Sequence, residues 1–137
     1  MLIKKEERSE LRLELLENTF TIHRFNSSAE IPNEIFSEAF FNIVKTDEEL
    51  SIVCRNSLTL NSERCDQSWS CIKVSGPLEL NTTGVLAKLS KVLADAHISI
   101  FAISTFDTDY ILVKTKKVNK AVLVLKTAGC QFTQATL

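Results

Sequence analysis

The sequence of 137 residues predicts an α+β fold made of two βαββαβ units with antiparallel sheets, of which the first unit is shortened. The main observation is an internal repeat, because residues 41–53 (FNIVKTDEELSIV) align without a gap on residues 101–113 (FAISTFDTDYILV). A second match in the same order, TFTIHRF at 19–25 with WSCIKVS at 69–75, supports a duplication. We therefore expect an N-terminal unit at 1–60, a linker at 61–68 and a C-terminal unit at 69–137.

The C-terminal unit follows the order strand, helix, strand, strand, helix, strand. The expected strands are 70–74, 98–105, 110–114 and 130–133, and the expected helices are 85–96 and 118–128. Each helix places its apolar side chains on one stripe at the helical period. The second and third strands are rich in β-branched and aromatic residues and flank the turn sequence Asp-Thr-Asp, which predicts a hairpin. Gly129 is a typical residue to end the last helix. This order is that of the ferredoxin-like fold.

The N-terminal unit is predicted to be a reduced version of the same order. Residues 11–15 alternate between leucine and charged side chains, and 20–25 can form a returning strand after a turn at 17–19, so we expect a leading hairpin. A short helix at 32–39 and a hairpin at 41–54 follow. The polar residues after this hairpin connect the two units.

Composition and charge exclude several classes of function. The 16 basic and 17 acidic side chains give a net charge of -1, which provides no general attraction to nucleic acid or to an acidic membrane. The 3 glycines form neither a GxGxxG dinucleotide fingerprint nor a GxxxxGK[ST] phosphate loop. The first ten residues, MLIKKEERSE, do not have the pattern of a secretory signal, and no apolar stretch is long enough for a membrane helix, so we expect a cytoplasmic protein.

No group of residues with a catalytic or metal-ligating pattern is found, so we expect no enzymatic activity, no cofactor and no metal site. The GxSxG and HExxH motifs do not occur in the sequence. His97 is expected at a helix end, where it complements the helix dipole, and His23 is expected on the surface of a strand. The four cysteines form no CxxC pair, and we interpret them as small buried apolar residues.

Two segments have the chemistry to hold a small ligand with opposite charges at its ends. The turn from Leu78 to Val85 contains Gly84 and presents the unpaired N–H groups of a helix start, which suit a carboxylate. The segment from Ser104 to Asp109 combines hydroxyls, carboxylates and a ring between two apolar strands, which suits an ammonium group. Because these are also ordinary turn residues, their chemistry alone favours ligand binding and a purely structural role equally.

The strings that contain these segments resemble a known family. LNTTGVLAKLSKVLADAHISIFAISTFDTDYILV (80–113), with WSCIKVSGPL (69–78) before it and EELSIVC (48–54) further upstream, looks like the small tandem ACT-domain proteins. These are similar to the regulatory domains of aspartokinases and to the CASTOR amino-acid sensors. The resemblance implies a non-catalytic, allosteric regulatory module that binds a free amino acid where two ACT units meet, within one chain or across a homodimer, and that acts on a regulated enzyme.

The resemblance also implies roles for individual residues. The backbone of the loop before the helix would face the carboxylate of the ligand, and Thr105 and Phe106 would contact its backbone. Asp109 would take its amino group or side-chain cation, and Ser51 and Ile52 would close the pocket from the other unit. The expected ligand-binding residues are thus Asn81, Thr82, Thr83, Gly84, Val85, Ser104, Thr105, Phe106, Asp109, Ser51 and Ile52. His97 stands where the family often has Gly, a difference that concerns the helix cap.

Two other functions stay open. A dimerisation module without a ligand fits the shortened first unit, whose half of a pocket would be lost. An RNA-recognition module shares the βαββαβ order, and the basic cluster Lys114, Lys116, Lys117 and Lys120 would be its only basic face, although we interpret it as the solvated start of the last helix. Unpaired strand edges favour pairing with a second copy, so we expect a homodimer.

Overall fold

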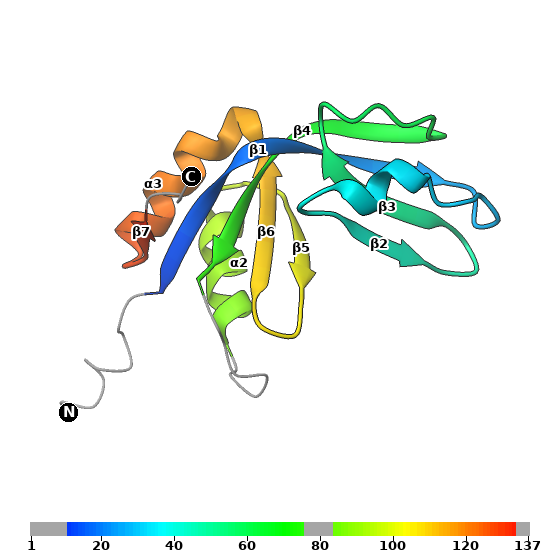
Figure 1. The fold of residues 1–137 in the computed structure, drawn as a ribbon. Helices are drawn as coiled ribbons and strands as arrows, with labels where there is room; N and C mark the ends of the chain where they lie inside the picture. The colour runs from blue at the N-terminus through cyan, green and yellow to red at the C-terminus, as the bar shows by residue number, and fades with distance from the viewer. Residues whose placement is uncertain (1–10, 76–83, 134–137) are drawn as a thin grey trace. The chain divides into compact units, whose positions relative to one another are not determined.

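The computed structural model describes residues 11–75 and 84–133, and Figure 1 shows how their helices and strands are connected. The strands in this part of the chain are β1 (Arg12–Phe25), β2 (Asn42–Lys45), β3 (Leu50–Arg55), β4 (Arg64–Val74), β5 (Ile100–Ser104), β6 (Asp109–Lys114) and β7 (Gln131–Thr133). The α-helices are α2 (Val85–Asp95) and α3 (Val118–Thr127), and the 3-10 helices are η1 (Asn33–Ser37) and η2 (Thr115–Lys117). The predicted α+β class is confirmed.

The strands of the described residues are hydrogen-bonded in the order β2-β3-β1-β4-β6-β5, and β7 pairs with β1. The pairs β1 with β3, β2 with β3 and β5 with β6 are antiparallel, whereas β1 and β7 are parallel. The chain divides into two compact units: unit 1 is Met1–Glu17 with Ser70–Leu137, and unit 2 is Asn18–Trp69. Strands β1 and β4 therefore each contribute residues to both units.

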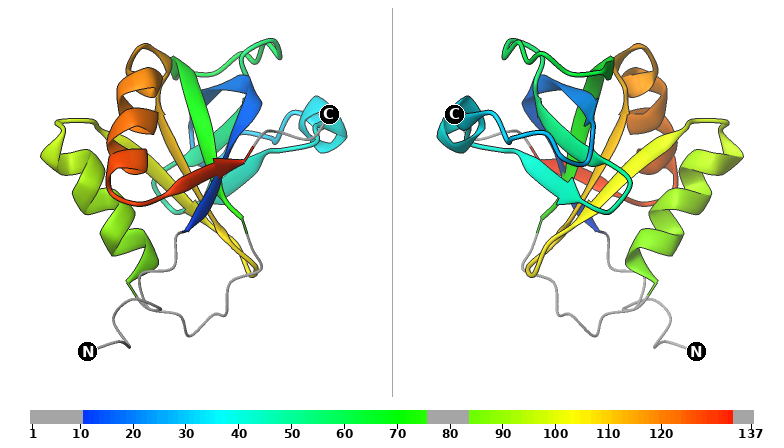
Figure 2. Two further views of the ribbon diagram at one scale, coloured as in Figure 1. Left: turned by 90° about the vertical axis from the view of Figure 1, so that its left-hand side faces the viewer. Right: turned by 90° about the vertical axis from the view of Figure 1, so that its right-hand side faces the viewer.

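Unit 1 contains the predicted βαββαβ order in the elements β4, α2, β5, β6, α3 and β7. The two α-helices lie side by side on one face of its strands, as Figure 2 shows. The apolar stripe of each helix explains this arrangement, because Leu89 and Leu93 of α2 and Ala121 and Leu125 of α3 are buried. They form one core with Leu13, Ile72, Val74, Ile98, Ile111, Val113 and Cys130.

The beginning of β1 adds a strand to unit 1 beyond the predicted order. Residues Arg12–Glu14 pair with β7, and the Ser75 N–H at the end of β4 donates a 2.8 Å hydrogen bond to the Arg12 carbonyl. This part of β1 thus lies between β7 and β4. Its Leu13 side chain is fully buried, so the strand supplies part of the core of unit 1.

The helices α2 and α3 end with the same hydrogen-bond pattern, in which the second residue after the cap donates back to the last turn. After α3, Gly129 has φ 102°, and the Cys130 N–H donates a 3.0 Å hydrogen bond to the Leu125 carbonyl. After α2, His97 takes the equivalent position with φ 61°, and the Ile98 N–H donates a 3.0 Å hydrogen bond to the Leu93 carbonyl. Both helices therefore end on a left-handed residue, which is glycine in one case and histidine in the other.

Unit 2 contains the second part of β1, η1, β2, β3 and the beginning of β4. Its core contains Phe25, Ile35, Leu50, Ile52 and Cys54, with Leu58 and Leu60 packed against them. The register aligns Phe25 with Leu50, and His23 with Ile52, across β1 and β3. The hairpin predicted at 41–54 is confirmed as β2 and β3.

Three expectations for the N-terminal half differ from the structure. The predicted hairpin at 11–25 is wrong, because β1 runs without a turn through Asn18 and pairs with β7 at one end and β3 at the other. The helix predicted at 32–39 is a 3-10 helix of 5 residues. Strand β4 begins at Arg64, inside the segment 61–68 where we expected a linker.

Candidate functional site

The loop predicted to face a carboxylate lies largely outside the described residues, because Asn81, Thr82 and Thr83 are not among them. Gly84 is described as the residue before α2, and Val85 is the first residue of this helix. Gly84 has φ 87°, a conformation that side chains other than glycine rarely adopt, and a Cβ atom there would meet nothing within 4 Å. The glycine is therefore explained by its backbone conformation, and the space around its Cα is open.

The segment predicted to face an ammonium group forms the turn between β5 and β6. The Thr105 N–H donates to the Thr108 carbonyl at 2.8 Å, and the Thr108 N–H donates to Thr105 Oγ1 at 3.2 Å. At the base of the turn, Ser104 Oγ donates to Asp109 Oδ1 at 2.7 Å. These bonds hold the two polar ends of the turn in a defined shape.

Thr108 anchors this turn to β4. Its side chain is buried, and its hydroxyl donates a hydrogen bond to the carbonyl of Val74, the last residue of β4. The chain continues from there into the segment that leads to Gly84 and α2. The turn and the end of β4, from which the first predicted segment departs, are thus side by side in unit 1.

Two groups of the turn are available to a ligand. The ring of Phe106 is 77% exposed, an unusual state for a large apolar side chain. Asp109 receives the Ser104 hydroxyl on one carboxylate oxygen, and no other hydrogen bond reaches its side chain from residues 11–75 and 84–133. An apolar surface and a positioned carboxylate are therefore presented by the same turn.

The two predicted residues of the other half, Ser51 and Ile52, belong to unit 2. Both lie in β3 between β1 and β2, so their backbone groups face these two strands. The Ile52 side chain is fully buried in the core of unit 2, whereas Ser51 is half-buried. Ser51 therefore offers a side chain to a contact, and Ile52 does not.

Three of the four cysteines are buried, as expected for small apolar residues, and one is exposed. Cys54, Cys71 and Cys130 are buried, and Cys65 on β4 is exposed. Burial raises the pKa of the Cys54 thiol to about 11 and that of Cys71 to about 12, so both are protonated at neutral pH. Among the described residues, no group of three or more His, Cys, Asp or Glu side chains could hold a metal ion.

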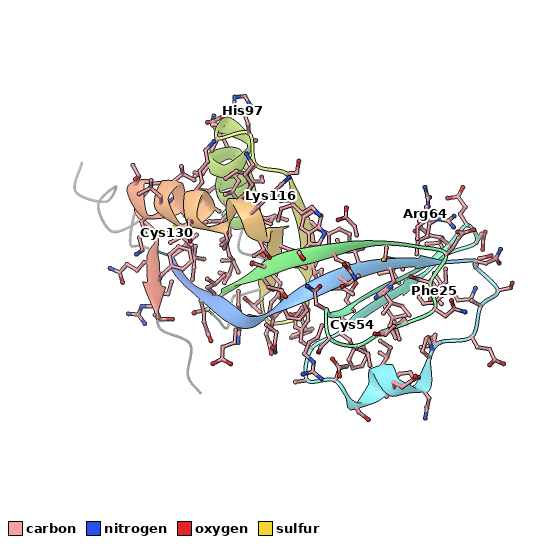
Figure 3. The ribbon with its side chains drawn as sticks, turned by 90° about the horizontal axis from the view of Figure 1, so that it is seen from above. Phe25, Cys54, Arg64, His97, Lys116 and Cys130 are labelled. Atoms are coloured by element: carbon pink, nitrogen blue, oxygen red, sulfur yellow. The ribbon has the colours of Figure 1, made fainter. Side chains whose placement is uncertain are left out.

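Sequence reasoning missed a buried polar row in unit 2. His23 was expected on the surface, which is wrong, because its side chain is 4% exposed on the same face of β1 as Thr21 and Phe25. Its Nδ1 lies 2.8 Å from Ser62 Oγ, and Thr21 Oγ1 donates to Asn56 Oδ1 at 2.7 Å. Phe25 and Cys54, which lie on this side of unit 2, are labelled in Figure 3. The spacing of His23 from Phe25 was the signal, since alternate residues of a strand share a face.

The described helices include none that is both long and apolar enough to cross a membrane. Comparisons with known proteins agree with the fold. Residues 64–127 match the family model of the ACT domain, and residues 18–58 match a second model, described as an N-terminal domain.

Several solved structures are similar to the chain. Protein Atu0741 from Agobacterium tumefaciens is 33% identical, with a TM-score of 0.85, and the alignment covers 93% of this chain and 96% of that one. The regulatory subunit of aspartate kinase from Thermus flavus is 10% identical, with a TM-score of 0.62 and coverage of 85% and 95%. The aspartate kinase from Clostridium acetobutylicum is 15% identical, with a TM-score of 0.64, over 82% of this chain and 33% of that enzyme. The chain therefore belongs to the same family as Atu0741, and its residues 64–127 match the ACT-domain model.

Proposed function

We propose that the chain is a regulatory module without catalytic activity, and that it binds a free amino acid where ACT units meet in a homodimer. The observation that carries this proposal is the turn between β5 and β6, which contains both an oriented Asp109 carboxylate and an exposed Phe106 ring. The ACT-domain match and the similarity to a regulatory subunit of aspartate kinase support the regulatory role.

The chemistry of the turn fits one half of a zwitterion. An α-ammonium group would donate to the free oxygen of Asp109, while Ser104 holds the other oxygen. The α-carboxylate would be received by N–H groups at the start of α2, which have no partner within the helix and carry a partial positive charge. In this proposal the residues from Asn81 to Val85 form the carboxylate side, and Ser51 contributes from a neighbouring ACT unit.

The test is a thermal-shift panel of the twenty amino acids on the wild-type chain and two variants. Asp109→Asn keeps an acceptor for Ser104 but removes the charge, whereas Asp107→Asn removes an exposed charge from the same turn and is the matched control. A ligand at 100 times its Kd stabilises the folded chain by about 2.7 kcal/mol, which raises Tm by several degrees.

We expect at least one amino acid to stabilise the wild type and Asp107→Asn but not Asp109→Asn. If no amino acid raises the Tm of the wild type, the proposal is wrong. Equal stabilisation of all three chains would keep amino-acid binding but place it away from Asp109.

A further inference from the structure

The outward face of η2 and α3 combines lysines with an exposed leucine. Lys116, Lys120 and Lys126 are exposed at helical spacing around Leu123, whose side chain is 63% exposed. Lys116 lies at the start of this face in Figure 3. No acidic residue occurs in the sequence after Asp109, so this face has no negative side chain of its own to balance it. We call Lys116, Lys120, Leu123 and Lys126 the basic face.

Two of the three charges of the basic face are not explained by the stability of the helix, whereas Lys126 lies in its last turn, where positive charge is favourable. Its first turn carries no acidic residue, and Lys116 and Lys120 lie at the N-terminal end, where positive charge opposes the helix dipole. Within the part of the chain that the structure describes, none of the three lysines forms an ion pair. A charge placed against the local preference of a helix indicates a role outside that helix.

Unit 2 carries a surface of the opposite kind. Glu30 and Glu34 are exposed and, among the described residues, form no ion pair, while Ile31 is 37% and Phe36 58% exposed. The Phe36 ring contacts the ring of Phe41 edge to face, with centroids 5.8 Å apart, so it is held in place although it faces solvent. We call Glu30, Ile31, Glu34 and Phe36 the acidic face.

The charge balance of the two regions matches these local surfaces. Residues 18–69 carry eight acidic and four basic side chains, whereas residues 84–133 carry three acidic side chains and seven lysines. Both surfaces have apolar side chains among charges of a single sign, and the signs are opposite. Complementary potentials with a small apolar centre are typical of specific protein contacts.

We propose that copies of this chain associate through these surfaces, with the acidic face of one copy bound to the basic face of another. Phe36 and Ile31 cover Leu123, and the two glutamates face the lysines around it. Each copy carries both surfaces, so two copies related by a two-fold axis form this contact twice, and the pair is closed. The inference names the contact behind the homodimer of the proposed function, and it rests on that dimer but not on the ligand.

The experiment measures self-association by sedimentation velocity over a range of protein and salt concentrations. Leu123→Glu and Phe36→Lys each place a wrong charge at the centre of one surface, and Val44→Lys does the same at an exposed apolar residue outside both surfaces. We expect each of the first two variants to weaken association at least tenfold, and Val44→Lys to leave it unchanged, because central apolar residues dominate a contact. Association of the wild type should weaken as salt rises.

A mixture of the two weakened variants is the decisive sample. In the mixture, the intact acidic face of Leu123→Glu meets the intact basic face of Phe36→Lys, and the remaining contact brings Glu against Lys, so association should return. Unchanged association of either single variant, or no recovery in the mixture, would overturn the named contact while a dimer remains.

A wild type that stays monomeric at every concentration would overturn both this contact and the homodimer, whereas the thermal-shift panel judges the ligand independently. The monomer could instead bind single-stranded DNA. If Lys116→Glu and Lys120→Glu abolished that binding, the basic face would be a nucleic-acid surface, and the inference would be wrong. Circular dichroism of each variant checks that the fold is retained.

Discussion

His23 makes the stability of unit 2 dependent on pH. Its side chain is 4% exposed, its Nδ1 is bonded to Ser62 Oγ at 2.8 Å, and its Nε2 has no hydrogen-bond partner among the described residues. Protonation would place a second N–H donor and a charge in this buried position, which burial opposes. Burial therefore lowers the pKa of His23 from its ordinary value of 6.5.

The direction of the effect follows from which state binds the proton. Below pH 6.5 the unfolded chain takes up a proton on His23 and the folded chain does not, so folding becomes less favourable as pH falls. The contribution of neutral His23 to the free energy of unfolding is complete above pH 6.5. It is lost as the pH falls from 6.5 toward the lowered pKa of His23 in the folded chain. One proton gives a slope of at most about 1.4 kcal/mol per pH unit, and the slope is close to zero well above pH 6.5, so a fall from pH 7.5 to 5.5 should cost at most about 1.4 kcal/mol.

Urea denaturation at pH 7.5 and 5.5 measures how much the free energy of unfolding decreases in the wild type, in His23→Phe and in His97→Asn. His97 is the other histidine of the chain, and it is exposed, with its side chain projecting from the end of α2 in Figure 3. Glu38, whose pKa is lowered chiefly by its hydrogen bond with Arg55, titrates below its ordinary 4.5 and does not interfere. We expect this decrease in stability at the lower pH in the wild type and in His97→Asn but not in His23→Phe. The reasoning fails if His23→Phe loses as much stability as the wild type.

Three further predictions concern unit 1, and each is measured as a change in the free energy of unfolding in urea. His97→Gly should stabilise the chain by about 1 kcal/mol, because glycine adopts φ 61° without strain, and a loss of stability would contradict this reading of the cap. Gly84→Ala should cost about 1 kcal/mol through its φ of 87° although the added methyl meets no atom, so an unchanged midpoint would show that the strain is absent. Thr108→Val should cost about 1–3 kcal/mol, because the Val74 carbonyl loses a buried donor, and a neutral substitution would mean that this bond contributes nothing.

The elements after Gly84 could be predicted from the sequence because their signals are local. The apolar stripes of α2 and α3 fix both the presence and the inner face of each helix, and Gly129 marks the end of the second one. The β5 and β6 hairpin was predicted from two apolar strands around a polar turn, and it is confirmed. In each case the deciding residues lie within one turn or one hairpin of each other.

The N-terminal strand could not be predicted in this way. Alternating side chains at 11–15 and 20–25 fit either a hairpin or one long strand, and Asn18 favoured a turn because of its own conformational preference. The pairing of β1 with β7, from the other end of the chain, is what selects the continuous strand. Sequence patterns give no information on a partner more than a hundred residues away.

The candidate site shows the same limit. Ser104 and Asp109 were named from their residue types, but the hydrogen bond between them depends on the register of β5 and β6. The anchoring role of Thr108 could not be foreseen, since its acceptor belongs to β4 and is known only from the order of strands in the sheet. The burial of His23 follows from the face of β1 that it shares with Thr21 and Phe25, and this face is buried only because β1 pairs with β3 in unit 2.

The position of β1 between β7 and β4 makes unit 1 discontinuous along the gene. A fragment cut at residue 69 would contain the whole βαββαβ order and still lack the strand that β7 pairs with, together with the buried Leu13. Unit 1 therefore has two boundaries in the sequence, one after Glu17 and one before Ser70, and unit 2 is inserted between them. Exchange of that insert between relatives would change the acidic face and leave the turn at Asp109 untouched.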